Sequence, residues 1–127
     1  MSLFGAGRLA SVHPDLVKLA VSVSCTTDIQ VVQGVRSERD EELAIREGRA
    51  VLRNADDSKH VLTSTRTQAH ALDLAPWPVQ WTDIPRFVSL ATLVLSTASN
   101  LSISVTWGGH WTHLADYDHW EIPDGHV

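Results

Sequence analysis

The chain has 127 residues, with 15 Asp and Glu against 10 Lys and Arg, and a formal net charge of −5. That length predicts a single domain, residues 1–127, with its own hydrophobic core. The acidic balance excludes a typical nucleic-acid-binding protein, which needs a concentrated cationic face. No apolar run in the sequence approaches the ~20 residues that span a bilayer, which excludes membrane insertion. The first residues also lack the basic and long apolar regions of a secretory signal, which predicts a protein made in the cytoplasm.

The first half of the chain predicts two helices and a strand between them. A proline followed by apolar residues at helical spacing predicts a helix over 14–24. The β-branched run 29–32 predicts a short strand. An S-x-x-D capping signal predicts a second helix over 37–48, which a glycine ends.

The second half predicts strands on both sides of a long helix. The run 71–76 is typical of a strand closed by proline. Asp83 can cap a helix that continues over 84–100. Strict alternation of apolar and polar residues predicts strands over 102–107 and 119–122. Separated helices and a small, hairpin-like sheet predict the α+β class, in which a small antiparallel sheet is flanked by helices.

The polar positions of two predicted strands indicate a candidate site. Asp73 and His119 each face away from the apolar side of their strand, so they lie close together if the strands are neighbours. Asp116 would lie on the loop just before the second strand. Two carboxylates and an imidazole suit a zinc ion with a general base, although a surface salt-bridge patch fits the spacing equally well. Glu121 shares a face with His119, where it either orients the ring or is a solvated carboxylate.

Motifs along nearly the whole chain resemble those of the zinc peptidases that cut peptidoglycan stem peptides. This family includes the D-Ala-D-Ala carboxypeptidases and the phage L-alanyl-D-glutamate endopeptidases, and the phage endolysin branch is the most similar. The resemblance implies a fold of the Hedgehog/D-Ala-D-Ala-peptidase type. The matching segments, in chain order, are 11–16, 32–37, 62–76, 107–111 and 116–121.

The resemblance also implies residue roles. The family pattern is S-x-H-x-x-G-x-A-x-D, followed later by an acidic residue, two others and a histidine. Carried over, it makes Asp73 and His119 zinc ligands and Asp116 the general base. Arg36, in a G-x-R segment, becomes the residue that stabilises the oxyanion. Without the resemblance, pairing with a nearby surface carboxylate explains Arg36 as well.

One position departs from the family pattern. A gapless alignment puts Arg66 where the first zinc-binding histidine belongs, and a guanidinium has no lone pair for a metal. Either another histidine completes the site or zinc binding is weak or lost. His70 is nearest in sequence, but it is three residues from Asp73 and should face away from it in a strand. His60 lies on the preceding loop and can reach back, and residues 58–60 resemble the family's S-x-H element if the loop carries an insertion. The third ligand therefore stays open between these two histidines.

Two classes of function follow from the resemblance. The first is a monomeric, endolysin-like metallopeptidase that cuts the L-Ala–D-Glu bond of peptidoglycan stem peptides, using a zinc-activated water and an acidic base. It would act on the cell wall after release from the host cytoplasm. A D-Ala-D-Ala carboxypeptidase is a related option with the same metal site. The second class is a degenerate wall-binding or virion protein, favoured by Arg66 at a ligand position.

Overall fold

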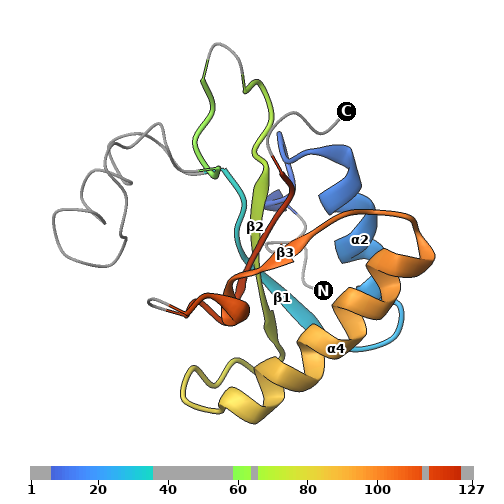
Figure 1. Cartoon of the computed structure of the whole chain (residues 1–127), viewed down its shortest axis with the longest axis vertical. Helices are drawn as coiled ribbons and strands as arrows, with labels where there is room; N and C mark the ends of the chain where they lie inside the picture. The colour runs from blue at the N-terminus through green and yellow to red at the C-terminus, as the bar shows by residue number, and fades with distance from the viewer. Residues whose placement is uncertain (1–6, 36–58, 64–65, 113–114, 124–127) are drawn as a thin grey trace, which may run out of the picture.

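The computed structural model describes residues 7–35, 59–63, 66–112 and 115–123, which form a four-stranded sheet with helices on one side (Figure 1). The strand order is β1-β2-β4-β3, and every pair of neighbours is antiparallel. This arrangement confirms the predicted α+β class. The elements in chain order are α2 (Pro14–Ser24), β1 (Ile29–Gln33), β2 (Ala71–Pro76), α4 (Ile84–Asn100), β3 (Thr106–Trp107), the short 3₁₀ helix η2 (Gly108–His110) and β4 (His119–Glu121).

Both long helices form where the sequence predicts them. The side chain of Asp83 accepts a hydrogen bond from the backbone N–H of Arg86, which caps α4, and His13 caps α2 in the same way through Asp15. Each helix buries the face on which apolar residues recur at helical spacing. The buried positions are Leu16, Leu19, Ala20 and Val23 in α2, and Phe87, Leu90, Ala91, Val94 and Ala98 in α4.

The prediction of a strand over 102–107 is wrong for its first four residues. Ser102 takes a left-handed conformation with φ 57°, and its N–H donates to the carbonyl of Ser99 at 3.1 Å. The N–H of Ile103 donates to the carbonyl of Ala98 at 2.9 Å, which completes a Schellman end of α4 with Ile103 buried. The alternating pattern therefore comes from a helix terminus followed by extended chain, and the paired strand consists of Thr106–Trp107.

The central strand β2 sets the register of the sheet. Asp73 pairs directly with His119 of β4 on one side and with Gln33 of β1 on the other. The pairing with β1 shifts between Val31 and Gln33, as at a β-bulge. All six residues of β2 are buried, so both faces of this strand are covered.

The two helices cover one face of β2, and the segment before the strand covers the other. Helices α2 and α4 pack against each other and both contact β2 (Figure 1). On the other side, His60 and Val61 are 3% and 1% exposed. The helix predicted over 37–48 lies outside the described residues. No helix in the described ranges is long and apolar enough to cross a membrane.

Candidate metal centre

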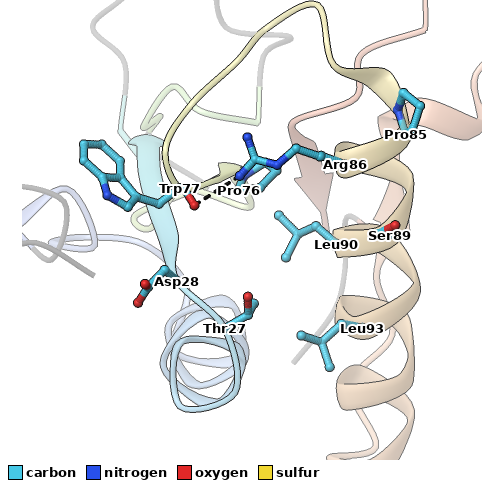
Figure 2. Close-up of a pocket in the computed structure, with 9 residues that line it drawn as sticks. All are labelled: Thr27, Asp28, Pro76, Trp77, Pro85, Arg86, Ser89, Leu90 and Leu93. Atoms are coloured by element: carbon cyan, nitrogen blue, oxygen red, sulfur yellow. Dashed lines mark hydrogen bonds between the residues drawn. The ribbon is translucent and has the colours of Figure 1, made fainter.

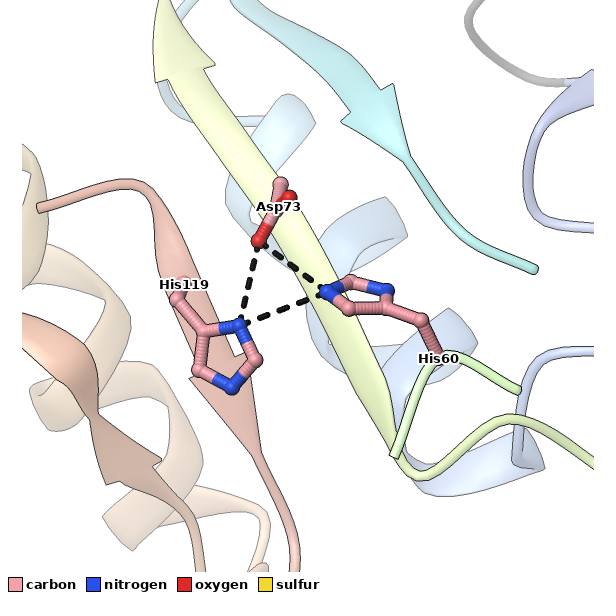
Figure 3. A group of neighbouring side chains, drawn as sticks. All are labelled: His60, Asp73 and His119. Atoms are coloured by element: carbon pink, nitrogen blue, oxygen red, sulfur yellow. Dashed lines mark hydrogen bonds and ion pairs between the residues drawn. The ribbon is translucent and has the colours of Figure 1, made fainter. Parts of the chain in front are cut away.

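Three side chains meet on the face of β2 that is turned away from α2 (Figure 3). Asp73 comes from β2, His119 from β4 and His60 from the segment before β2, and all three are buried. The Asp73 Oδ1 atom lies 3.3 Å from His119 Nδ1 and 3.4 Å from His60 Nε2. The two imidazole nitrogens are 3.3 Å apart. We call these three residues the His–Asp–His cluster.

The spacing of the three donor atoms matches one face of a tetrahedral metal site. A metal with bonds of ~2.0–2.1 Å and tetrahedral angles has ligand–ligand separations of ~3.3 Å. The three measured separations lie at 3.3–3.4 Å. Within the part of the chain that the structure describes, Asp73 Oδ1 is also buried without a well-formed hydrogen bond. The cluster can therefore hold a metal ion, and an N, N, O donor set leaves one tetrahedral position for substrate or water.

The outward nitrogen of each cluster histidine has its own partner. His60 Nδ1 lies 2.7 Å from the carbonyl oxygen of Gly34, and His119 Nε2 lies 2.9 Å from Glu121 Oε1. Such partners fix the ring orientation and the tautomer of metal-binding histidines. A side chain at position 34 has no room, since a Cβ there would lie 2.0 Å from the Arg8 carbonyl oxygen. The contact of Glu121 with His119 is the orienting arrangement that strand alternation allowed.

In the absence of a metal, the ionisable groups of the cluster shift one another's pKa values. Burial alone would lower the pKa of His119, but its close contacts with the carboxylates of Asp73 and Glu121 raise it to about 10. Burial would raise the pKa of Asp73, but His60 and His119 hold it well below its usual range. Burial would also raise the pKa of Glu121, but its contacts with His119 and Lys59 lower that pKa to about 2. A metal cation in the cluster would therefore take the place of a proton that His119 holds at neutral pH.

Asp116 lies on the turn that leads into β4, as the sequence predicted. Its backbone N–H donates to the carbonyl of Gly108 at 3.0 Å, and its carbonyl accepts from His119 at 3.3 Å. A Cβ on Gly108 would lie 2.4 Å from the Asp116 carbonyl oxygen and 3.0 Å from His119 Cβ. The close approach of this turn to η2 therefore requires glycine at position 108.

Asp118 is a component of this region that the sequence analysis missed. Burial raises its pKa to about 9, helped by a hydrogen bond with the Asp116 side chain and by the negative charges of Asp73 and Asp116. A carboxyl group that keeps its proton at neutral pH thus lies beside the candidate base. The signal available in the sequence was the second acidic residue directly before His119.

Trp111 forms a partly exposed wall beside the cluster. Its ring centroid lies 5.0 Å from that of His119, with the planes tilted by 45°, and the side chain is 38% exposed. Trp107 and Trp120, in contrast, stack on each other in the core at 5.9 Å. Trp111 is therefore the aromatic residue of this group that solvent and a ligand can reach.

Of the two histidines proposed as the third ligand, His60 lies in the cluster. The ring of His70 lies against that of His13, with centroids 5.5 Å apart, and its residue pairs by backbone with Ile122 and Lys59. Arg66 Nη1 donates to the Val61 carbonyl at 3.3 Å. The groups that lower the pKa of Asp73 are the two imidazoles and not Arg66.

Two further expectations concern the surroundings of the cluster. Asp73 and His119 were expected on a free face of the sheet, yet they are only 6% and 8% exposed because the segment with His60 folds over them. Arg36 lies outside the described residues, two positions after Gly34.

A separate pocket of about 340 Å³ lies between the end of β2 and the first turns of α4 (Figure 2). It includes none of the three cluster residues. The guanidinium of Arg86 donates to the carbonyls of Pro78 at 2.7 Å and Trp77 at 3.1 Å, so this cation supports the chain turn. Within the described residues, the group suited to metal-assisted chemistry is therefore the His–Asp–His cluster.

Comparisons with known proteins agree with this geometry. The chain is 28% identical over 123 residues to the L-alanyl-D-glutamate peptidase of Escherichia phage T5, covering 93% of this chain and 85% of the relative. The crystal structure of the Serratia marcescens L-Ala D-Glu endopeptidase ChiX superposes with a TM-score of 0.78 at 25% identity, covering 97% of this chain and 89% of the other. The family described as phage L-alanyl-D-glutamate peptidase matches residues 1–126. The chain therefore belongs to the phage L-alanyl-D-glutamate peptidase family.

Proposed function

We propose that this protein is a metal-dependent peptidoglycan endopeptidase that hydrolyses the L-alanyl-D-glutamate bond of stem peptides. Membership of the family and the names of the two relatives support the substrate and the bond. The single observation that carries the metal-dependent chemistry is the buried triangle of donor atoms, with separations of 3.3–3.4 Å.

We assign zinc to this site, held by His60 Nε2, Asp73 Oδ1 and His119 Nδ1. Two imidazoles and one carboxylate form a donor set that zinc commonly has in hydrolytic sites, with one position left open. A bound zinc ion supplies Lewis acidity toward the scissile carbonyl and the attacking water. The contacts of His60 with Gly34 and of His119 with Glu121 keep the two rings turned toward the ion.

The proton transfers fall to Asp116 in this proposal. It accepts a proton from the attacking water and returns it to the amine that leaves when the peptide bond breaks. Its position three residues before His119 supports this role. The backbone of Asp116 is hydrogen-bonded to Gly108, and Gly108 lies closely against both Asp116 and His119. Arg36 is assigned to the developing oxyanion on the family resemblance alone.

The test uses the full chain and a soluble muramyl peptide that begins with L-Ala-D-Glu, with products identified by mass spectrometry. We expect cleavage between these two residues, loss of cleavage after chelation, and recovery with added zinc. An intact substrate at all zinc concentrations would favour the alternative of a non-catalytic wall-binding or virion protein.

Asp116→Asn separates the chemistry from metal binding. The amide keeps the shape of the side chain and loses its basicity, so we expect turnover to fall ~10²–10⁴-fold with zinc affinity nearly unchanged. Asp28→Asn, at an exposed position far along the chain from the cluster, serves as the matched control. Full activity of Asp116→Asn would remove this residue from the mechanism.

A further inference from the structure

His60 reaches the cluster from a segment without regular secondary structure, so something else must hold it there. Residues 59–63 form a turn and a bend before β2. The His60 ring is buried and contacts the Gly34 carbonyl through Nδ1. The ring contacts, with Gly34 at its outer edge and with Asp73 and His119 at its inner edge, do not by themselves fix the chain that carries the ring.

The residue before His60 makes polar contacts that fasten this segment to the sheet, in addition to the burial of Val61 directly after it. Lys59 Nζ donates to the Ile122 carbonyl at 2.9 Å and pairs with Glu121 Oε2 at 2.6 Å. The Lys59 carbonyl accepts from the His70 N–H at 2.8 Å. The backbone and the side chain of Lys59 therefore attach the segment to residues at both β2 and β4.

Glu121 connects Lys59 with a second cluster residue. One oxygen of its carboxylate contacts His119 Nε2 at 2.9 Å, and the other contacts Lys59 Nζ. The side chains of Lys59 and Glu121 are only 17% and 20% exposed, so water and salt screen the pair less than they screen a surface pair. Lys59 is thus linked to His60 through the chain and to His119 through Glu121.

We propose that Lys59 is a positioning residue for the metal centre, which sets the place of His60 and the orientation of His119 before the metal binds. This inference rests on the proposed function, because it needs the His–Asp–His cluster to bind zinc. The Lys59 ammonium donates to two acceptors, the Glu121 carboxylate and the Ile122 carbonyl, and so joins the segment before β2 to β4. Lys59 is not among the three donor residues of the cluster, so the role assigned to it is to hold two of them in place.

The charge and the placement of Lys59 predict opposite effects, which makes the proposal testable. If only its positive charge mattered, removing it would tighten the binding of a cation. If positioning dominates, removing it releases His60 and lets Glu121 and His119 turn, so zinc binds more weakly. Outer partners of metal ligands typically contribute ~10–100-fold to affinity.

The experiment compares Lys59→Met, Lys59→Arg and the exposed control Lys18→Met in the full chain. Zinc affinity is measured by competition with a chromophoric chelator, and ligand geometry by the visible absorption of the Co²⁺ form. We expect Lys59→Met to lower zinc affinity ~10–100-fold and to change the Co²⁺ spectrum. Lys59→Arg should restore most of both, because a guanidinium can still donate to a carboxylate and a carbonyl. Lys18→Met should match the wild type.

The failures of the two proposals are distinguishable. A Lys59→Met protein with wild-type or tighter zinc binding and an unchanged Co²⁺ spectrum would overturn the role of Lys59 and leave the metal centre intact. A wild-type chain that takes up neither ion would overturn both. Should Lys59→Met fail to fold, Lys59→Gln replaces it, with the same expected loss of affinity and the same contradicting outcome.

Discussion

The cluster draws its donors from two regions that hold them in different ways. Asp73 and His119 are directly opposite residues of the antiparallel pair β2–β4, so backbone hydrogen bonds of the sheet fix their distance. His60 comes from a segment that side-chain contacts with Gly34, Glu121 and Ile122 attach to the sheet. The strand pair forms a rigid half of the site, and the segment forms a half whose geometry depends on a few polar contacts.

Loss of the Asp73 carboxylate should cause the largest effect, because this group of the rigid half both binds the metal and stabilises the two buried histidines. Asp73→Ala removes a metal ligand and leaves two buried imidazoles without the carboxylate that both of them contact. We expect zinc binding to be abolished and the metal-free chain to lose about 3–5 kcal/mol of unfolding free energy, as when one partner of a buried ion pair is removed. Urea unfolding in the presence of chelator measures the second effect. An unchanged unfolding midpoint would show that the pair does not stabilise the metal-free fold.

Removing the segment's donor should affect the metal more than the fold. His60→Ala is expected to weaken zinc binding by more than the ~10–100-fold typical of outer partners, while the sheet and core remain folded. The matched control is His70→Ala, which changes the other candidate histidine in the same part of the chain. Zinc titration followed by chelator competition gives both affinities. The assignment of the third ligand would be reversed if His70→Ala, and not His60→Ala, destroyed binding.

The strand half should also carry the pH dependence of metal binding. The pKa of His119 is raised to about 10 in the metal-free chain, so zinc must displace its proton at neutral pH. Raising the pH removes this competitor, and apparent affinity should rise about tenfold per pH unit between about pH 6 and about pH 8. Calorimetry in buffers of different ionisation enthalpy should detect at least one released proton. Affinity that is flat with pH would mean that His119 is already deprotonated before the metal arrives.

The smallest expected effect concerns the position where the family pattern has a histidine. Since Arg66 contacts the Val61 carbonyl and His60 occupies the cluster, Arg66→His should change zinc affinity by less than about threefold. The same chelator competition measures it, with Arg8→His as a control for an added imidazole elsewhere. A large gain in affinity would show that the segment can rearrange and that position 66 can supply the donor.

These differences explain which parts of the molecule the sequence could predict. Local rules placed α2, α4 and the polar faces of β2 and β4, because helical and strand periodicities act over a few residues. The prediction of a strand over 102–107 was wrong because Ser102 and Ile103 form hydrogen bonds with the end of α4, whatever the alternation of apolar and polar residues there.

The candidate site divides along the same line. Alternation placed Asp73 and His119 on polar faces and the family resemblance made them candidate ligands, whereas neither decided between His60 and His70. The place of His60 in the cluster depends on its contacts and those of Lys59 with residues far away in the sequence, and the local signal for it was the S-x-H pattern of residues 58–60. The raised pKa of Asp118 depends in the same way on burial in the folded chain.

The attachment of His60 to a connecting segment has a consequence for how such a site can evolve. Substitutions and length changes in a loop leave the pairing of β2 and β4 intact. A second histidine can therefore arise at a neighbouring loop position before the first one is lost. The third donor then changes position through single substitutions, by way of a protein that has both histidines. Asp73 and His119 lack this freedom, because a slip of either strand by one residue turns its side chain to the opposite face. Searches for distant relatives should hold the two strand positions fixed and let the third donor vary along the segment before β2.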